Sequence, residues 1–160
     1  MMKANTAMVT LLKSVDLKAH LTPTLMEIAQ KGFEFRDECY VLRAFVAKSL
    51  NILRSSFPDR TGYECFVNSL HIEDYAAKTP LAQAILLLRG LFDTWRTIMP
   101  TDVLVGIVSA DEFSVVVKVH LRRPAEAWLG ANLDAYENAI MSFESSDDVF
   151  CEIAGNLAAS

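Results

Sequence analysis

Histidine and cysteine side chains are the groups in this sequence that could act as bases, nucleophiles or metal ligands. His71 and Glu73 form an H-x-E pair of the kind found in zinc deaminases, and Asp74 follows directly. That chemistry also needs two cysteine ligands in a P-C-x-x-C motif, and the chain has no C-x-x-C pair. Because no further histidine or cysteine stands at metal-ligand spacing, we interpret residues 71–74 as an exposed polar turn.

The other reactive side chains also lack a partner at a diagnostic spacing. His120 lies between Lys118 and Arg122 in an alternating stretch, which predicts a half-exposed strand residue. The three cysteines are predicted to be small core residues, and the chain contains no dinucleotide, P-loop, zinc-protease or nucleophile-elbow motif. We therefore predict no catalytic, metal or cofactor site, no small-molecule substrate and no enzymatic activity. A further hypothesis is an enzyme whose active site forms when folding brings distant residues together around His71 or His120.

Composition and charge restrict the class of protein further. The chain has 160 residues, of which 52% are apolar and 22% charged, and its net charge is −5. This size predicts one domain over residues 1–160, and the negative charge argues against general nucleic-acid binding. Apolar stretches such as 103–110 are far shorter than the roughly twenty residues of a membrane helix. Three cysteines without a C-x-x-C pair, and an apolar run at 7–12 that is too short for a secretory signal, predict a cytoplasmic protein without membrane contact.

Apolar spacing and helix-capping residues predict two long helices. From residue 34 to residue 57 apolar side chains recur at three- and four-residue steps, and Cys39 lies on that stripe. A second helix is predicted over residues 80–99, with Thr79 as its N-cap and Pro80 in its first position, where the missing N–H costs nothing.

The second half of the chain has the patterns of strands. Residues 103–109 are apolar on both faces, as in a central strand, and residues 113–122 alternate between apolar and more polar side chains. Three further elements are expected: a strand at 63–67, a strand at 139–144 and a helix at 149–157. The predicted fold class is α+β, a single domain in which two long helices pack on a mainly antiparallel sheet.

Charge is distributed unevenly along the chain. Residues 1–80 carry ten bases and nine acids, whereas residues 81–160 carry five bases and eleven acids. From Pro124 onward there are seven acids and no base. Such a segment is either a solvated acidic surface or an electrostatic face for a basic partner. Trp128 and Tyr136 lie inside it; they suit an interface anchor, but the frequent burial of large aromatic residues favours the core.

Two stretches carry a resemblance to a known class of proteins. Residues 66–75 (FVNSLHIEDY) precede a helix that ends near Trp95, and in residues 120–145 (HLRRPAEAWLGANLDAYENAIMSFES) a strand is followed by a tryptophan after a proline and by a D-x-Y-E step. Together they resemble the small cytoplasmic immunity proteins of bacterial polymorphic-toxin systems, notably those of contact-dependent growth inhibition. The resemblance covers about the second half of the chain.

The resemblance implies a protein that binds one cognate toxin domain and blocks its active site or its access to substrate. Such toxins are often nucleases, and an acidic inhibitor can offer carboxylates where a nuclease holds phosphates. The expected partner-binding residues are five acids and two aromatics: Glu126, Trp128, Asp134, Tyr136, Glu137, Asp147 and Asp148. If the interface lies elsewhere, the next exposed acids to consider are Asp111 with Glu112, and Glu73 with Asp74.

A type III secretion chaperone is the alternative function. Such chaperones are also small, acidic, cytoplasmic α/β proteins without catalytic residues, and this composition is similar to theirs. They are usually dimers that hold an unfolded effector segment in hydrophobic grooves. A stable dimer that binds an extended peptide would favour this alternative, whereas a monomer that binds only a folded domain would favour the immunity protein.

Overall fold

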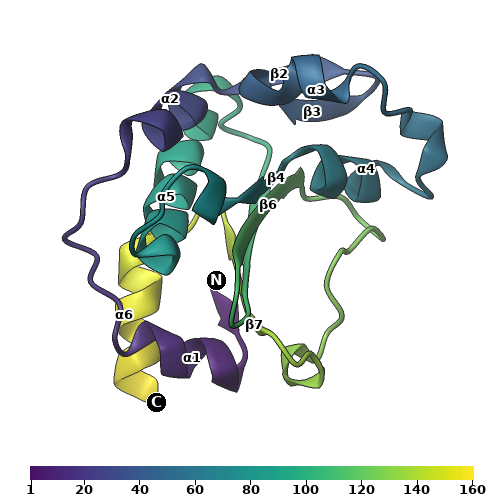
Figure 1. Ribbon diagram of the computed structural model, residues 1–160. Helices are drawn as coiled ribbons and strands as arrows, with labels where there is room; N and C mark the ends of the chain where they lie inside the picture. Colours follow the sequence, from purple (N-terminus) through teal and green to yellow (C-terminus); the bar gives the residue numbers. More distant parts are fainter.

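A five-stranded antiparallel sheet forms the centre of the computed structural model, which describes all 160 residues (Figure 1). The strand order is β1-β7-β5-β6-β4, and a separate hairpin is formed by β2 and β3. The strands are β1 (Lys3–Ala4), β2 (Phe33–Arg36), β3 (Cys39–Leu42), β4 (Ser69–His71), β5 (Leu104–Ala110), β6 (Val115–Leu121) and β7 (Ala139–Glu144). The predicted α+β class with an antiparallel sheet is confirmed.

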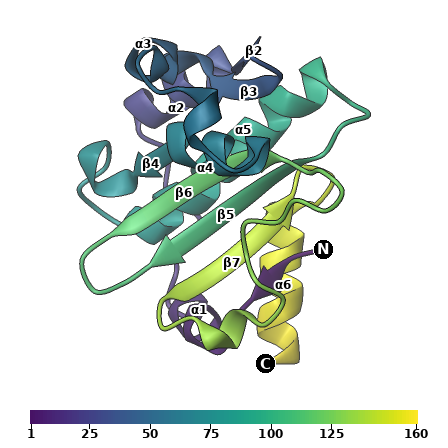
Figure 2. The ribbon, with the colours of Figure 1, turned by 90° about the vertical axis from the view of Figure 1, so that its right-hand side faces the viewer.

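Helices α1, α5 and α6 cover one face of the sheet, and helix α4 and a long loop lie on the other (Figures 1 and 2). The helices are α1 (Thr6–Leu12), α2 (Pro23–Lys31), α3 (Val46–Ser49), α4 (Arg60–Val67), α5 (Pro80–Ile98) and α6 (Val149–Ala159). Helix α5 packs on β5 and β6, α1 packs on β7, and α2 packs on the outer side of α5. Helix α4 lies beside β6 and contacts β3, so it connects the hairpin to the sheet.

The core lies between α5 and the sheet, where the apolar faces of both elements meet. Trp95 and Phe92 of α5 are the largest fully buried side chains, and they belong to a cluster of 30 buried apolar residues. Gly106 of β5 faces the same helix, and a Cβ atom added there would lie 2.5 Å from Leu88 and 3.0 Å from Phe92. The absence of a side chain at Gly106 therefore lets α5 approach the middle of the sheet closely.

Five predicted elements of the second half are present with small shifts in their ends. Helix α5 occupies the predicted 80–99 region, and Pro80 stands at its start. The strands expected at 103–109, 113–122 and 139–144 are β5, β6 and β7, and the closing helix is α6. Thr79 occupies the N-cap position, as predicted, but it makes no capping hydrogen bond: its φ is 50°, and its hydroxyl donates to the Lys78 carbonyl instead of accepting from the helix.

The long helix predicted over residues 34–57 is absent. Strands β2 and β3 occupy its first part, joined by Asp37 and Glu38, whose φ values of 50° and 64° are those of a type I′ hairpin turn. Phe33 of β2 packs edge-to-face on Trp95 with ring centroids 5.2 Å apart, and Tyr40 of β3 does the same at 4.9 Å. This aromatic packing holds the segment as a hairpin against α5, so tertiary contacts decide against the helical pattern.

The strand predicted at 63–67 is also wrong, because these residues form helix α4. The Asp59 side chain accepts a hydrogen bond of 2.7 Å from the Gly62 N–H and caps the helix. The only strand nearby, β4, begins at Ser69, after the helix has ended. Residues 60–67 are amphipathic at helical spacing, and the helix places a carboxylate in the interior.

That carboxylate belongs to Glu64, which is fully buried and makes a bidentate pair with Arg123. The two oxygens accept from the Arg123 guanidinium at 2.7 and 2.8 Å. They also accept the backbone N–H groups of Tyr40 at 2.7 Å and Leu121 at 2.9 Å. One turn further along α4, the Asn68 amide accepts from the Leu42 N–H and donates to the Tyr40 and Val119 carbonyls. Helix α4 thus joins β3, β6 and the segment after β6 through polar side chains.

Replacement of Arg123 by methionine is expected to lower the free energy of unfolding by about 3–5 kcal/mol, because it leaves the buried Glu64 carboxylate without its cation. Urea denaturation measures the loss. The matched control is Arg122→Met: Arg122 pairs with Glu144 at 2.8 Å on the surface, and its loss is expected to cost less than about 1 kcal/mol. Equal losses in the two variants would contradict the central role of the buried pair.

Gly106→Ala and Gly155→Ala are expected to change stability in opposite directions. The first places a methyl group against Leu88 and Phe92 and is expected to cost about 1–3 kcal/mol through overpacking. The second adds a methyl group with nothing within 4 Å on helix α6, where alanine is preferred to glycine by roughly 0.5–1 kcal/mol. Thermal unfolding followed by circular dichroism distinguishes them, and a stabilised Gly106→Ala variant would refute the packing argument.

Candidate functional site

The loop between β6 and β7, residues 122–138, holds most of the predicted partner-binding residues. It runs across the face of the sheet opposite α5, where only α4 also lies, and we call this the open face (Figure 2). At its start, Arg123 is fixed by Glu64. At its end, the buried Asn5 side chain donates to the carbonyls of Leu133 at 3.2 Å and Asn138 at 2.8 Å. The loop is therefore tied to the fold at both ends by buried polar side chains.

The middle of the loop packs on the sheet through apolar residues. Leu129 and Leu133 join Ile107, Ile140 and Val105 in a small apolar cluster of their own. The loop thus covers part of the open face and leaves its own outer side to solvent.

The two aromatic residues predicted as anchors both reach the surface. Trp128 is 45% exposed, and its ring lies 5.8 Å from the Lys118 ammonium nitrogen. Tyr136 is 39% exposed, and its hydroxyl accepts a hydrogen bond of 2.9 Å from the Gly130 N–H. The expectation that these residues belong to the core is wrong, because the loop that carries them lies outside the sheet.

Several predicted acids are used inside the chain. Glu126 accepts from the Thr61 N–H at 3.2 Å and lies 3.8 Å from the Arg60 guanidinium. Asp147 accepts from the Glu144 N–H and forms an ion pair of 2.7 Å with the amino group of Met1. Asp148 caps α6 by accepting from the Cys151 N–H at 3.0 Å. These three carboxylates are therefore already engaged within the fold.

Asp134 and Glu137 have fewer internal contacts. Asp134 accepts a hydrogen bond of 2.8 Å from the Thr6 N–H at the start of α1 and has no ion pair. Glu137 is exposed and has neither a hydrogen bond nor an ion pair within the chain. Strand β7 separates these two residues from Asp147 and Asp148, and its six residues span roughly 20 Å. The predicted set is therefore divided between the two ends of β7.

The structure brings other residues beside Glu137. Ala110 of β5 pairs with Ala139 of β7 and with Val115 of β6, so the hairpin tip at 111–114 lies next to the end of the loop. We call the resulting surface the acidic sheet end. It consists of Asp111, Glu112, Phe113, Asp134, Tyr136 and Glu137.

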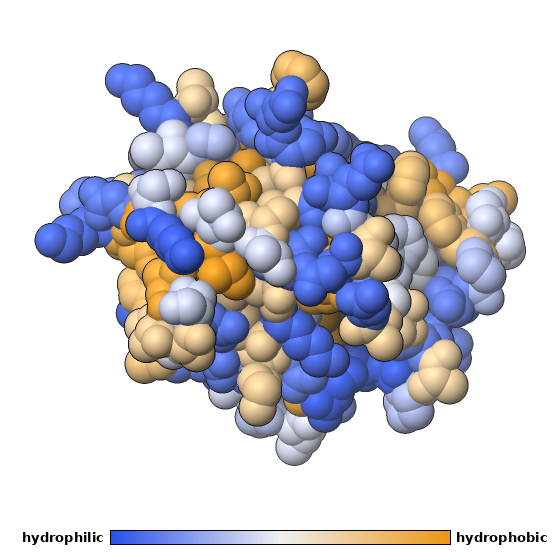
Figure 3. All heavy atoms as spheres, turned by 90° about the horizontal axis from the view of Figure 1, so that it is seen from below, coloured by the Kyte–Doolittle hydropathy of each residue, from blue (hydrophilic) through white to orange (hydrophobic).

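The acidic sheet end combines unpaired charge with exposed aromatic area. None of its four carboxylates takes part in an ion pair within the chain. Phe113 at the hairpin tip is 86% exposed, the most exposed large apolar side chain of the molecule. Seen from below, hydrophilic and apolar residues lie side by side on the surface (Figure 3). In the sequence, Phe113 directly follows the acids Asp111 and Glu112, but it lies outside the base-free segment that starts at Pro124.

The Asp111 carboxylate is held in its ionised form. It accepts from the backbone N–H groups of Phe113 and Ser114, both at 2.7 Å. These hydrogen bonds lower the pKa of Asp111 below its usual value, because they favour the charged carboxylate. The hairpin tip therefore presents a fixed negative charge directly before Phe113.

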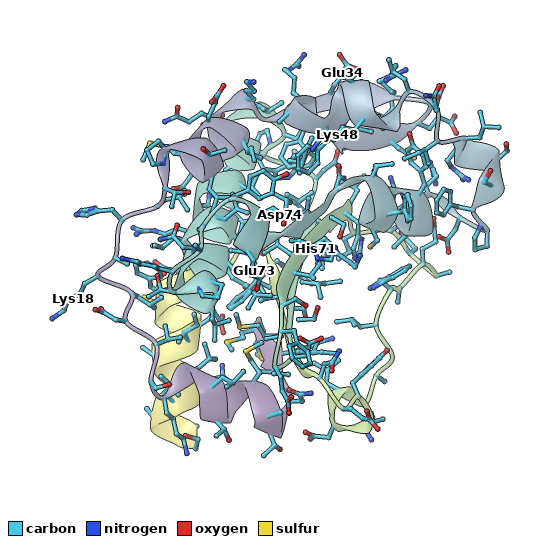
Figure 4. All side chains as sticks on the ribbon, in the orientation of Figure 1. Lys18, Glu34, Lys48, His71, Glu73 and Asp74 are labelled. Atoms are coloured by element: carbon cyan, nitrogen blue, oxygen red, sulfur yellow. The ribbon has the colours of Figure 1, made fainter.

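The polar turn at 71–74 lies at the edge of the sheet, on β4 and the following 3₁₀ turn (Figure 4). His71 and Asp74 are exposed, while the Glu73 carboxylate accepts from the Val115 N–H at the start of β6. No three histidine, cysteine or acidic side chains of the chain are grouped so that they could hold a metal ion. Glu73 thus has a structural role in joining the turn to β6.

Two predictions for reactive residues need correction. His120 is only 5% exposed instead of half-exposed, because α4 and the loop cover its face of β6. Cys39 and Cys65 are buried, as predicted, and burial raises the pKa of the Cys65 thiol to about 12. Cys151 is exposed, because it lies on the outer side of α6.

Comparison with known proteins places the chain in a family. The model of the Uncharacterized protein PM0498 family matches residues 3–156, and the chain belongs to this family. It is similar to Uncharacterized protein PM0498 of Pasteurella multocida (strain Pm70), with 37% identity over 60 residues. This alignment spans 38% of each chain, so it covers well under half the length of that relative. No solved structure matches the chain, and none of its helices has the length and apolar character needed to cross a membrane.

Cys151 is expected to be the one thiol of the native protein that reacts with iodoacetamide, and Asp148→Asn is expected to increase its rate. The negative charge of Asp148, together with its hydrogen bond, raises the pKa of Cys151 and so lowers the fraction of reactive thiolate at a given pH. Asparagine keeps an N-cap oxygen but removes the charge. Mass spectrometry at pH 8 should show a severalfold faster modification of Asp148→Asn.

Glu152→Gln is the control, because Glu152 raises the pKa of the same thiol only through a weaker charge effect. Its modification rate should change less than that of Asp148→Asn. A larger effect of Glu152→Gln, or a fast reaction at Cys39 or Cys65, would contradict the arrangement described for α6 and the core.

Proposed function

We propose that the chain is an immunity protein that binds a cognate toxin domain in the cytoplasm, one to one, and has no catalytic role of its own. The observation that carries the proposal is the acidic sheet end. There, the hairpin tip and the end of the loop each present carboxylates without internal cations and one exposed aromatic side chain, Phe113 or Tyr136. Such a surface suits a basic protein partner, since large apolar anchors within a charged rim are typical of tight interfaces.

The charges of this surface match the kind of partner that the resemblance implies. A nuclease toxin needs a basic surface to hold the phosphate backbone of its substrate. Carboxylates from the hairpin tip and from the end of the loop can pair with the same arginine and lysine side chains. Binding there would deny the nucleic acid access to the toxin, whether the active site is filled or only shielded.

Phe113 and Tyr136 are the proposed anchors, and the acids around them are the proposed source of fast association. Truncation of a buried aromatic anchor acts mainly on dissociation, whereas charges outside the anchor act mainly on the encounter rate. Asp134 and Glu137 keep their expected roles in this proposal. Glu126, Asp147 and Asp148 support the fold, and Trp128 lies beside Lys118, outside the acidic sheet end.

The test is co-expression of the chain with the C-terminal domain encoded immediately upstream. A stable one-to-one complex that restores growth in the presence of the toxin supports the proposal. A chain that forms no such complex, and that runs as a dimer binding an extended peptide, would instead indicate a secretion chaperone. A lone monomer without any complex would also refute the immunity function.

Within such a complex, Phe113→Ala is expected to accelerate dissociation by roughly 30-fold, equivalent to about 2 kcal/mol. The double variant Glu112→Lys/Glu137→Lys is expected to slow association by about tenfold at low salt and to weaken its salt dependence. Surface plasmon resonance measures both rates.

The controls are Phe35→Ala and Glu27→Lys, an exposed aromatic on β2 and an exposed acid on α2. Both lie outside the acidic sheet end and should leave the two rates unchanged. Equal effects of the control and test variants would place the interface elsewhere.

A further inference from the structure

A groove lies between the open face of the sheet and the underside of loop 122–138. Its volume is about 410 Å³, and its lining comes from β5, β6 and β7 on one side and from residues 126–133 on the other. Val105 and Ile107 contribute apolar floor, and Trp128 and Leu129 contribute apolar wall. A groove of this size, mostly apolar and closed by a tethered loop, is in the range of small-molecule sites in proteins.

His120 is the buried polar group of this groove. Its Nδ1 lies 2.9 Å from the Leu121 carbonyl, which can only accept, so Nδ1 carries the proton. The other ring nitrogen, Nε2, makes no hydrogen bond within the chain, and it keeps some solvent-accessible surface. Burial lowers the pKa of His120 below its usual value, so the ring is neutral at pH 7. Because His120 lines the groove, its Nε2 is an available hydrogen-bond acceptor in a hollow that is otherwise largely apolar.

The charged side chains at the rim of the groove are paired with one exception. Arg122 pairs with Glu144 at 2.8 Å, and Glu126 pairs with Arg60 at 3.8 Å. Lys3 on β1 also lines the groove, is exposed, and has no carboxylate within 4 Å. The rim therefore offers one uncompensated positive charge, which complements a single negative charge on a ligand.

We propose that this groove binds a small aromatic monoanion that donates a hydrogen bond to His120 Nε2 from one end and places a carboxylate near Lys3 at the other. The flat apolar body would lie on Val105 beside Trp128, at the edge of the cluster in which Leu129 packs against Ile107. This site is separate from the acidic sheet end, and the proposal holds whether or not the chain is an immunity protein.

The strand pairing sets the length of such a ligand. His120 pairs with Val105, and Lys3 pairs with Ser142, so β5 and β7 lie between the two residues. Three strand spacings correspond to roughly 14 Å between the backbones of β6 and β1. The histidine and lysine side chains cover part of this distance, and a para-substituted phenol with a short carboxylate arm bridges the rest.

The probe is 4-hydroxyphenylacetate, and the comparison compound is 4-methoxyphenylacetate, which has the same shape and charge but no hydroxyl donor. Binding to the full chain is followed by calorimetry and by amide chemical shifts. The hydroxyl compound is expected to bind with a Kd on the order of 1 mM, as for a small ligand of this size. It should shift the amides of Val105 and Ile107 and the indole N–H of Trp128. The methoxy compound should bind roughly 3- to 10-fold more weakly, which is the effect of one hydrogen bond.

His120→Phe and Lys3→Met are the variants that remove the two polar contacts. Each is expected to weaken binding of 4-hydroxyphenylacetate severalfold, and His120→Phe should also abolish the difference between the two compounds. The matched controls are His71→Phe and Lys13→Met, a histidine and a lysine that do not line the groove. Both controls should bind like the unaltered chain.

Equal affinity of the unaltered chain for the two compounds would overturn the proposal. This comparison uses only the unaltered chain, so it does not depend on the folding of any variant. The absence of shifts in the groove at about 10 mM probe, well above the expected Kd, would overturn it as well. Chemical-shift changes confined to another surface, or unchanged affinity of the His120→Phe variant, would also overturn the proposal.

Discussion

The buried pair of Glu64 and Arg123 is the interaction on which the rest of the structure depends. A fully buried carboxylate is tolerated only when cations and N–H groups form hydrogen bonds with it. Glu64 accepts four such bonds, from Tyr40, Leu121 and Arg123. Tyr40 brings the β2–β3 hairpin, Leu121 brings the end of β6, and Arg123 brings the start of the loop. One carboxylate thereby sets the position of the hairpin relative to the sheet and the direction in which the loop departs.

The elements that the sequence predicts well are those whose own pattern determines them. Helix α5 has a wide apolar face and a proline at its start, and β6 alternates along its length, so neither depends on distant residues for its type. Helix α4 and the β2–β3 hairpin differ in this respect. Helix α4 is held by the contacts of the buried Glu64. The hairpin is held by the packing of Phe33 and Tyr40 on Trp95, because its turn at Asp37 and Glu38 contains neither glycine nor asparagine. Both causes lie in contacts between segments far apart in the sequence.

The candidate site was only partly predictable, because a count of charges does not show which charges are already in use. The acids after Pro124 have no base among them in the sequence, but the fold supplies cations and N–H groups from the first half. The Met1 amine pairs with Asp147, and Arg60 pairs with Glu126. Glu137 alone of these seven acids has no internal contact. The pairing of β5, β6 and β7 then places Phe113 and the acids of the hairpin tip beside it, a proximity that no local pattern indicates.

The position of β1 in the sheet has a consequence for how the chain folds. Strand β1 pairs only with β7, so the first residues of the sheet meet their partner across nearly the whole sequence. Contacts of such long range close slowly, because the chain loses the entropy of a large loop before the pairing stabilises it. During synthesis, β1 and the adjoining α1 have no strand to join until residues 139–144 have left the ribosome. The apolar side of α1 is exposed throughout that interval, and completion of the sheet waits for the synthesis of β7.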